Sequence, residues 1–221
     1  MSLAIFDLDN TLIAGDSDHA WGEFLIEQGI VDAQSYKQAN DLFYQQYQRG
    51  ELDIYAYLSF ALEPLTQFSL THLESLHQQF MKDKIDPLLL PKAFDLLKKH
   101  RDQGDYLLII TATNRFITGP IAERLGVDDI LASEPEIVDG KYTGRISGIP
   151  CYQAGKVERL NQWFQDHDQD LRDSYFYSDS HNDIPLLEQV DHPVVVDADE
   201  QLLSHAKKQG WTIISLRNQA R

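Results

Sequence analysis

The sequence predicts an α/β fold, in which helices wrap a doubly wound, mostly parallel β-sheet and a helical domain is inserted after the first strand. Two observations lead to this prediction. Short aliphatic and aromatic runs alternate with segments of helical periodicity, which is typical of parallel strands joined by helices. About a hundred residues separate the first run from the second, far more than an ordinary connection, so this stretch must hold structure of its own.

The strands are expected where the apolar runs lie. These runs span residues 3–6, 106–111, 130–132, 174–178, 193–196 and 212–214. Apolar residues at helical spacing predict helices that include residues 94–97, 117–125 and 157–164. Gly104 and Gly126 follow the first two of these segments. They predict where these helices end, because glycine adopts the left-handed conformation of a helix end at little cost. Gly155 precedes the third.

The long insertion predicts a helical cap over residues 15–85, which leaves 1–14 and 86–221 as the core domain. Aromatic and aliphatic residues recur at helical spacing near 21–28, 36–47 and 73–80. The simplest interpretation makes these rings the cap's own hydrophobic core. A role in binding a ligand is the alternative.

A β-hairpin is expected at residues 136–144. Asp139 and Gly140 supply the positive φ angles that a tight hairpin turn requires. We expect this hairpin to project from the core near the entrance of the site that the motifs below describe.

Composition and charge narrow the function. The chain carries 35 acidic and 19 basic residues, a formal net charge of −16, which argues against a nucleic-acid partner because Lys and Arg bind phosphate backbones. Cys151 is the single cysteine, so no intrachain disulfide forms, which fits a reducing compartment. No apolar run reaches the roughly 20 residues of a membrane span, and Asp7 comes too early for a secretory signal. We therefore expect a soluble, cytoplasmic protein without a membrane partner, and no pattern specifies an oligomeric state.

Two carboxylates, Asp7 and Asp9, follow the first strand. Ligands of doubly wound sheets bind beyond the carboxyl ends of the strands, so residues there are candidates for chemistry. Two neighbouring acids push their pKa values apart, which suits one for nucleophilic attack and the other for proton transfer. The alternative is an ordinary acidic turn.

Thr111 ends the second strand, and Lys156 opens a helix after Gly155. A hydroxyl at a strand end and the backbone N–H groups that follow it can hold phosphate oxygens. An ammonium group at the positive end of a helix favours an anion. Taken singly, Thr111 is a β-branched strand end and Lys156 a surface lysine.

Asp179 and Asp183 follow the strand at 174–178. Carboxylates four residues apart on a turn form a hard oxygen site that suits Mg²⁺. Proteins usually bind this ion through few ligands of their own and several waters. Asp183 can also cap the helix expected at 184–190.

The order of these four motifs resembles that of the haloacid dehalogenase superfamily of phosphatases, specifically its phosphoserine-phosphatase-like branch. The stretch from Asp7 to Thr11 is similar to the first motif, Thr111 to the second, Lys156 to the third, and Asp179 with Asp183 to the fourth. The resemblance covers nearly the whole chain, including the cap and the hairpin. It implies that the sheet is the Rossmann-like core of this superfamily.

The resemblance also implies the hydrolysis of a small-molecule phosphate monoester. Asp7 would attack phosphorus and form an aspartyl-phosphate. Asp9 would protonate the leaving group and then activate the water that cleaves the intermediate. Thr111 and Lys156 would bind the remaining phosphate oxygens.

The resemblance implies Mg²⁺ as the cofactor. The ion would be held by the side chains of Asp7 and Asp179 and by the backbone carbonyl of Asp9. Asp183 would orient the metal-bound waters and the lysine of the third motif.

The cap is expected to select the leaving group. Phosphoserine-specific enzymes of this branch carry an acidic residue shortly after the first motif and an arginine in the cap. Asp16 takes the first place, and Asp18 and His19 follow it, so these side chains can pair with a substrate ammonium or imidazolium. Arg49 is the one arginine of the predicted cap. A phosphorylated amino alcohol without a carboxylate therefore fits better than phosphoserine, and L-histidinol phosphate is the first expected substrate, with phosphoserine as the alternative.

The expected substrate-binding residues also include those that follow the second motif and one within the fourth. They are Ala112, Thr113, Asn114, Arg115 and Asn182. Arg115 fits a surface ion pair as well as it fits a contact with the leaving group.

Three other functions share some of these features. A phosphorylatable signalling receiver also combines a doubly wound sheet, Mg²⁺ and a phospho-accepting Asp, but its acceptor follows a later strand and it lacks a large helical insertion. A phosphotransferase or mutase of the same superfamily keeps the four motifs and differs in the acceptor. A structural or binding protein would leave the cluster of acids without a purpose.

Overall fold

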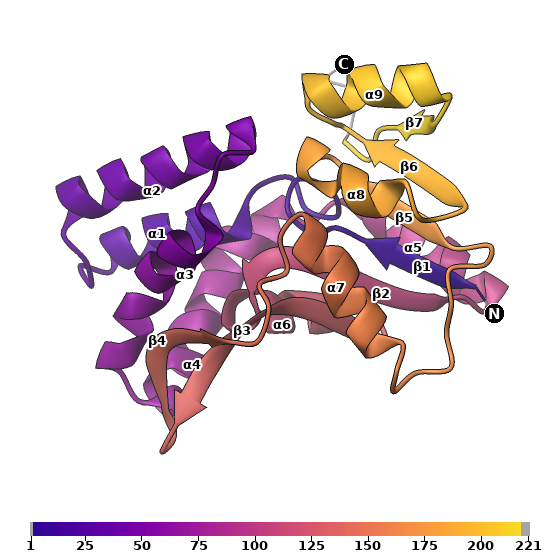
Figure 1. The fold of residues 1–221 in the computed structure, drawn as a ribbon. Coiled ribbons are helices and arrows are strands. Elements are labelled where there is room, and N and C mark those ends of the chain that lie inside the picture. The colour runs from indigo at the N-terminus through magenta and orange to yellow at the C-terminus, as the bar shows by residue number, and fades with distance from the viewer. Residues whose placement is uncertain (1, 218–221) are drawn as a thin grey trace.

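The computed structural model describes residues 2–217, within which one seven-stranded sheet has the order β4-β3-β2-β1-β5-β6-β7. The strands are β1 (Leu3–Phe6), β2 (Tyr106–Asn114), β3 (Asp129–Val138), β4 (Lys141–Ser147), β5 (Tyr175–Ser178), β6 (His192–Val196) and β7 (Thr212–Ile214). Neighbouring strands are parallel, except that β4 runs antiparallel to β3. The predicted α/β fold is confirmed, because the chain builds the sheet outward from β1 in both directions (Figure 1).

Helices cover both faces of the sheet. Those that follow the insertion are α5 (Pro91–Gln103), α6 (Arg115–Leu125), α7 (Ala154–Trp163), α8 (Ile184–Leu187) and α9 (Glu200–Gln209). One face packs against α5, α6 and the insertion, and the other packs against α7, α8 and α9. In β1, Ala4 and Phe6 point to the first face, whereas Leu3 and Ile5 point to the second. Burial on both faces explains why this strand is an unbroken apolar run.

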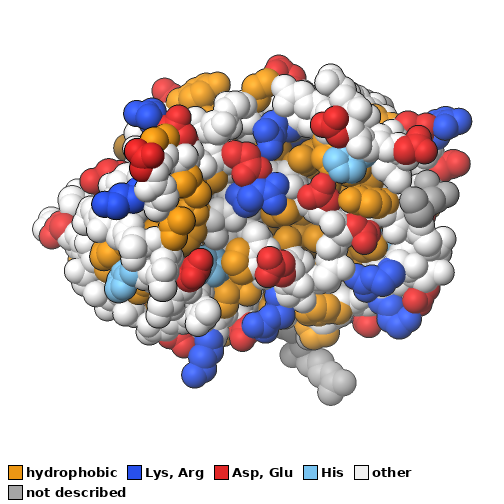
Figure 2. Space-filling view, turned by 90° about the horizontal axis from the view of Figure 1, so that it is seen from below, with side chains coloured by type: hydrophobic (Ala, Val, Ile, Leu, Met, Phe, Trp, Pro, Cys, Tyr) orange, Lys and Arg blue, Asp and Glu red, His pale blue; other side chains and the backbone are white. Residues whose placement is uncertain are grey.

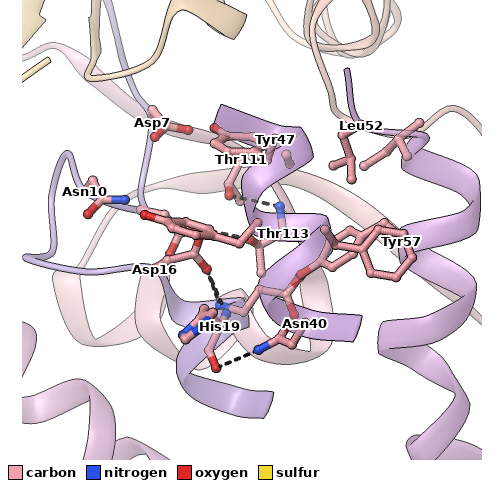
Figure 3. A pocket seen from close by; sticks show the side chains of 16 residues that line it. Asp7, Asn10, Asp16, His19, Asn40, Tyr47, Leu52, Tyr57, Thr111 and Thr113 are labelled. Atoms are coloured by element: carbon pink, nitrogen blue, oxygen red, sulfur yellow. Dashed lines mark hydrogen bonds between the residues drawn. The ribbon is translucent and has the colours of Figure 1, made fainter. Parts of the chain in front are cut away.

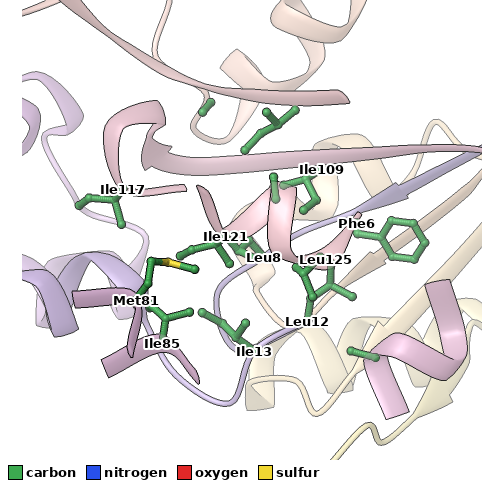
Figure 4. Packing of buried hydrophobic residues seen from close by; sticks show 14 of the residues in the cluster. Phe6, Leu8, Leu12, Ile13, Met81, Ile85, Ile109, Ile117, Ile121 and Leu125 are labelled. Carbon is green, nitrogen blue, oxygen red and sulfur yellow. The ribbon is translucent and has the colours of Figure 1, made fainter. Parts of the chain in front are cut away.

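The insertion between β1 and β2 is helical, as predicted. It contains α1 (Ser17–Glu27), α2 (Ala33–Arg49), α3 (Ile54–Leu62) and α4 (Leu70–Phe80), with the short turns η1 (Glu63–Gln67), η2 (Met81–Ile85) and η3 (Asp86–Leu88). Trp21 of α1 and Phe80 of α4 belong to the same hydrophobic cluster as Phe6 of the sheet. Figure 4 shows this shared core, where Met81 and Ile85 lie close to residues of α6. The boundaries of core (1–14 and 86–221) and cap (15–85) stay a prediction.

Two elements differ from the predicted ones. Helix α3 was not expected, because its apolar sequence shows little helical periodicity; Asp53 starts it by accepting hydrogen bonds from the N–H groups of Tyr55 and Ala56. The helix expected at 184–190 begins at Ile184 as predicted but ends at Leu187 (α8), and a 3₁₀ turn, η4 (His181–Asp183), precedes it. The Ser180 side chain caps this turn, so the Asp183 carboxylate is left for other contacts.

The predicted hairpin is formed by β3 and β4. Its turn has positive φ angles at Asp139 (51°) and Gly140 (74°). The hairpin packs against α3 and η1 of the insertion, and Gly144 faces Thr66 there. It contributes none of the residues that line the main pocket described below, so it braces the insertion instead of bordering that pocket.

The surface carries both signs of charge. On the face shown in Figure 2, Lys and Arg side chains lie among Asp and Glu side chains, so the net negative charge does not gather there in one block. Between residues 2 and 217, no helix combines the length and the apolar character that crossing a membrane requires.

Candidate active site

The predicted motifs converge at the carboxyl ends of β1, β2 and β5, beside the N-terminus of α7. Strand β1 is the point from which the sheet is built in both directions, and doubly wound sheets bind ligands at such a switch point. Asp7 follows β1, and its N–H donates a hydrogen bond to the Tyr177 carbonyl at 2.9 Å. Asp179 directly follows β5, so the first and fourth motifs lie side by side.

Lys156 joins the first and fourth motifs. Its Nζ lies 2.8 Å from Asp7 Oδ1 and 2.7 Å from Asp183 Oδ1, and its side chain is only 2% exposed. Ser178 Oγ donates to Asp183 Oδ2 at 2.7 Å, which fixes that carboxylate. Burial alone lowers the pKa of Lys156, but the charges of Asp183 and Asp7 outweigh burial and raise it. Lys156 is therefore a permanent buried cation and not a surface lysine.

Thr11 links Asp7 to Asp179. Its Oγ1 lies 3.4 Å from Asp7 Oδ2 and 3.1 Å from Asp179 Oδ1, and it accepts a hydrogen bond from the Asp179 N–H at 3.1 Å. The sequence placed Thr11 in the first motif but assigned it no contact. The structure shows a hydroxyl that holds two carboxylates at a fixed separation.

The carboxylates here outnumber the cations. Burial raises the pKa of Asp7 to about 7, although Lys156 opposes this rise. Burial and the charges of Asp7 and Asp183 raise the pKa of Asp179 well above its usual range. A divalent cation would offset this excess of negative charge. Within residues 2–217 no three His, Cys, Asp or Glu side chains cluster tightly enough to hold a metal alone. Two carboxylates, a backbone carbonyl and waters remain, a donor set that fits Mg²⁺.

Asp9 points to the other side of the site. Its Oδ1 accepts a hydrogen bond from the Ser17 N–H at 2.7 Å, and its Oδ2 accepts one from Thr113 Oγ1 at 2.9 Å. Burial and the charge of Asp16 raise the pKa of Asp9 to about 6, although these hydrogen bonds oppose the rise. A carboxyl group with such a pKa can both hold and release a proton near neutral pH.

Thr111 is oriented by its neighbour. The Thr113 N–H donates to Thr111 Oγ1 at 3.2 Å, so the Thr111 hydroxyl keeps its own hydrogen to donate. Both threonines and Ala112 border the pocket that contains Asp7 (Figure 3). This edge of β2 can therefore bind an anion through neutral donors.

The pocket extends from Asp7 into the helical insertion. Its lining residues are Asp7, Asp9, Asn10, Asp16, Asp18, His19, Asn40, Phe43, Tyr44, Tyr47, Leu52, Ile54, Tyr57, Thr111, Ala112 and Thr113. Asp7 and the threonines stand at the sheet, Asp16 lies at the start of α1, and aromatic rings of α2 and α3 close the other side (Figure 3). The lining contains no Lys or Arg among the residues that the structure describes. The pocket therefore offers acceptors and flat apolar surfaces.

The structure separates the predicted substrate-binding residues into two groups. Asp16, Asp18, His19, Ala112 and Thr113 line the pocket.

Asn114, Arg115 and Asn182 do not line the pocket, because their side chains are used elsewhere. Asn114 caps α6, and Asn182 contacts the end of α2. Arg115 Nε donates to both carboxylate oxygens of Glu134, at 2.8 and 2.9 Å, which favours the ion-pair interpretation.

The aromatic wall of the pocket contains rings that the sequence assigned first to the hydrophobic core of the cap, with ligand binding as the alternative. Trp21 and Phe24 are core residues, as expected, but Phe43 and Tyr47 line the pocket together with Tyr57. One signal was available, since α2 is otherwise strongly polar and its rings recur on one side at a helical spacing.

A hydrogen-bond network holds the end of α2 against the core. Asn182 Nδ2 donates to the Tyr47 carbonyl at 3.1 Å, and Asn182 Oδ1 accepts from Gln153 Nε2 at 2.9 Å and from the Tyr152 hydroxyl at 3.1 Å. Gln153 Nε2 also donates to the Gly50 carbonyl at 3.4 Å. These contacts keep Tyr47 beside Asp7.

Replacing Asn182 with alanine should cost about 1–3 kcal/mol of unfolding free energy, because it leaves buried partners unsatisfied. The matched control is Gln189→Ala, whose exposed amide donates only to the Pro185 carbonyl. Urea unfolding should show a change within about 0.5 kcal/mol for the control. Equal losses for the two variants would contradict the assigned network.

Comparisons with known proteins agree with this site. Residues 4–188 match the family of haloacid dehalogenase-like hydrolases. A histidinol-phosphatase of Neisseria meningitidis serogroup C is 44% identical over 220 residues, covering 98% of this chain and 99% of the relative. A crystal structure of a protein of unknown function from Bordetella pertussis Tohama I is 42% identical with a TM-score of 0.92, covering 98% and 99%. A phospho-aspartyl intermediate analogue of phosphoserine phosphatase has a TM-score of 0.68 at 19% identity, covering 98% and 94%, which shows a shared fold.

The chain belongs to the family of haloacid dehalogenase-like hydrolases. Within this family it is an enzyme of the phosphatase class, as the four motifs at the strand ends and the phosphatase among its relatives indicate.

Proposed function

We propose that this enzyme hydrolyses a small-molecule phosphate monoester with Mg²⁺ as cofactor and an aspartyl-phosphate at Asp7 as intermediate. The observation that carries the proposal is the position of Asp7, buried at the switch point of the sheet between Lys156 and Thr11 and open to the main pocket. A carboxylate with one fixed oxygen and access to a pocket is suited to in-line attack on phosphorus.

Asp9 is proposed as the general acid and base. Hydrogen bonds from Ser17 and Thr113 fix its carboxyl group in the wall of the pocket that Asp7 also lines. Asp9 would first give its proton to the leaving oxygen and then take one from the water that attacks the intermediate. Its raised pKa supports both steps near neutral pH.

The transferring phosphoryl group would be held from two sides. Lys156 Nζ and the Thr111 hydroxyl would donate to its oxygens, with the backbone N–H groups at the end of β2 behind them. The side chains of Asp7 and Asp179 and the Asp9 carbonyl would hold Mg²⁺, which supplies charge neutralisation when bound. Asp183 would keep Lys156 in position.

L-histidinol phosphate is the substrate we propose first. The 44% identical relative is named as a histidinol-phosphatase, and the pocket supplies acids for an ammonium or imidazolium group. Phosphoserine is the second candidate, since a phosphoserine phosphatase shares the fold. Its carboxylate, however, finds no Lys or Arg among the described lining residues, which favours the amino alcohol. Phosphate transfer to an acceptor other than water is excluded if released phosphate equals the substrate consumed.

Phosphate release across a panel of L-histidinol phosphate, phosphoserine and sugar phosphates tests this function. We expect the first to be turned over with the highest kcat/KM when Mg²⁺ is present. Equal values for histidinol phosphate and phosphoserine would contradict the charge argument.

Removing divalent cations with excess chelator should reduce the rate to background, because the surplus of carboxylates around Asp7 then repels the phosphate group. Adding back Mg²⁺ in excess should restore the rate. Full activity in the presence of chelator would contradict the metal assignment.

A further inference from the structure

The proposed reaction releases an alcohol, and a few side chains of the pocket are placed to bind this leaving group. We propose that Asp18 is the residue that binds the positively charged group of the leaving alcohol, against a wall formed by Phe43, Tyr44 and Tyr57. The inference rests on the proposed phosphatase function and names the part of the substrate that this pocket selects.

Two other side chains at this end of the pocket, Asp16 and His19, already have protein partners. Asp16 Oδ1 accepts from the N–H groups of Asp18 and His19, at 3.0 and 2.8 Å, and so caps α1. His19 Nε2 lies 3.3 Å from Asp41 Oδ1. Both Asp9 oxygens accept hydrogen bonds, as described above. Asp16 Oδ1 and His19 Nε2 are therefore used for contacts within the insertion.

Asp18 differs from them. The residue is only 5% exposed and lines the pocket, and within residues 2–217 its Oδ2 has no hydrogen-bond partner. Tyr57, which also lines the pocket, lies close enough to this carboxyl group to lower its pKa. A buried acceptor without a partner costs free energy unless a ligand completes it.

Charge supports the same assignment. Burial raises the pKa of Asp18 to about 8; Tyr57 opposes this rise, and the charges of Asp16 and Asp9 add to it. The carboxyl group is therefore mostly protonated at pH 7 until a neighbouring cation lowers its pKa. The pocket lining described here contains no Lys or Arg that would neutralise the carboxylate. A cation on the ligand would do so, whereas an anionic leaving group would be repelled.

The rings define the rest of the ligand. Phe43 and Tyr44 of α2 and Tyr57 of α3 line the same pocket as Asp18 and present flat surfaces there. Such surfaces stack with a flat ring and attract a cation through their π-systems. The leaving group that fits is an amino alcohol with a flat, nitrogen-containing ring. A small amino acid side chain would leave the aromatic wall uncovered.

Two substrates and one isosteric variant test the inference. The kcat/KM of the wild-type protein and of Asp18→Asn is measured with L-histidinol phosphate and with p-nitrophenyl phosphate, whose leaving group has a ring but no positive charge. We expect the variant to lose roughly a hundredfold more on the first ester than on the second, as when one partner of a buried charge pair is removed. Asp53→Asn is the matched control, because Asp53 is an exposed helix cap outside the pocket and asparagine caps equally well.

Binding of L-histidinol by calorimetry gives a readout that needs no turnover. The wild-type protein should bind this alcohol, and Asp18→Asn should bind it about a hundredfold more weakly. An equal loss on both esters, or unchanged affinity for histidinol, would overturn the role of Asp18. If the wild-type protein binds histidinol but releases phosphate from neither ester, the proposed function fails while the alcohol subsite stands.

Discussion

Replacing Asp7 with asparagine should reduce phosphate release by at least about a thousandfold, because an amide cannot form the acyl-phosphate that the reaction requires. The folded structure should persist. Asparagine has the same shape, and its carbonyl oxygen can still accept from Lys156 Nζ, which also pairs with Asp183. The change also removes one of the buried carboxylates that repel each other around this lysine.

Steady-state phosphate release and urea unfolding together check this prediction. Unfolding free energy should stay within about 1 kcal/mol of the wild-type value or rise. A folded Asp7→Asn protein with substantial activity would remove Asp7 from the role of nucleophile.

Replacing Gly155 with alanine should destabilise the protein and displace Lys156. A Cβ on Gly155 would lie 2.1 Å from the Pro150 carbonyl oxygen, and this neighbour is backbone that cannot rotate away. The start of α7 must then move, and Lys156 is the next residue. We expect a loss of about 1–3 kcal/mol in unfolding free energy, as for other overpacked sites. Turnover should fall as well, because Lys156 loses its fixed distance to Asp7.

Gly119 provides the matched control for this substitution. It lies within α6, where an added Cβ would meet only the Arg115 side chain at 3.8 Å, an ordinary contact. Gly119→Ala should therefore change the unfolding free energy by less than about 1 kcal/mol, since the helix preference of alanine and the strain of a Cβ before Pro120 oppose each other. Chemical denaturation of both variants makes the comparison, and equal effects would show that the close approach at Gly155 carries no energetic weight.

The fold could be predicted from the sequence because local patterns and tertiary structure agree there. Successive side chains of an inner strand point to opposite, buried faces of the sheet, as those of Leu3 and Phe6 do. An unbroken apolar run is therefore most simply interpreted as an inner strand. The positions of Asp7, Thr111 and Asp179 follow from the rule that strand ends meet at one edge of the sheet. In the structure Asp7 contacts Lys156, Thr11 links Asp7 to Asp179, and Asp7 and Thr111 line the same pocket.

The wall of the pocket could not be predicted in the same way. A ring at helical spacing has the same pattern whether it faces a core, as Trp21 does, or a cavity, as Phe43 does. The contacts of Asn182 and Arg115 depend on residues distant in sequence, Tyr47 and Glu134 respectively. Spacing alone carries no information about such partners.

Trapping the covalent intermediate tests the central claim most directly. Asp9→Asn protein is mixed with p-nitrophenyl phosphate and Mg²⁺. The p-nitrophenolate leaving group departs without a proton, so the first step needs no general acid. Only the second step, hydrolysis of the aspartyl-phosphate, needs the base that this variant lacks. We predict a burst of p-nitrophenol close to one equivalent of enzyme, and a single phosphoryl group on Asp7 in the acid-quenched protein by mass spectrometry. A phosphoryl group on another residue, or steady turnover with no phosphorylated protein at any time, would contradict the mechanism.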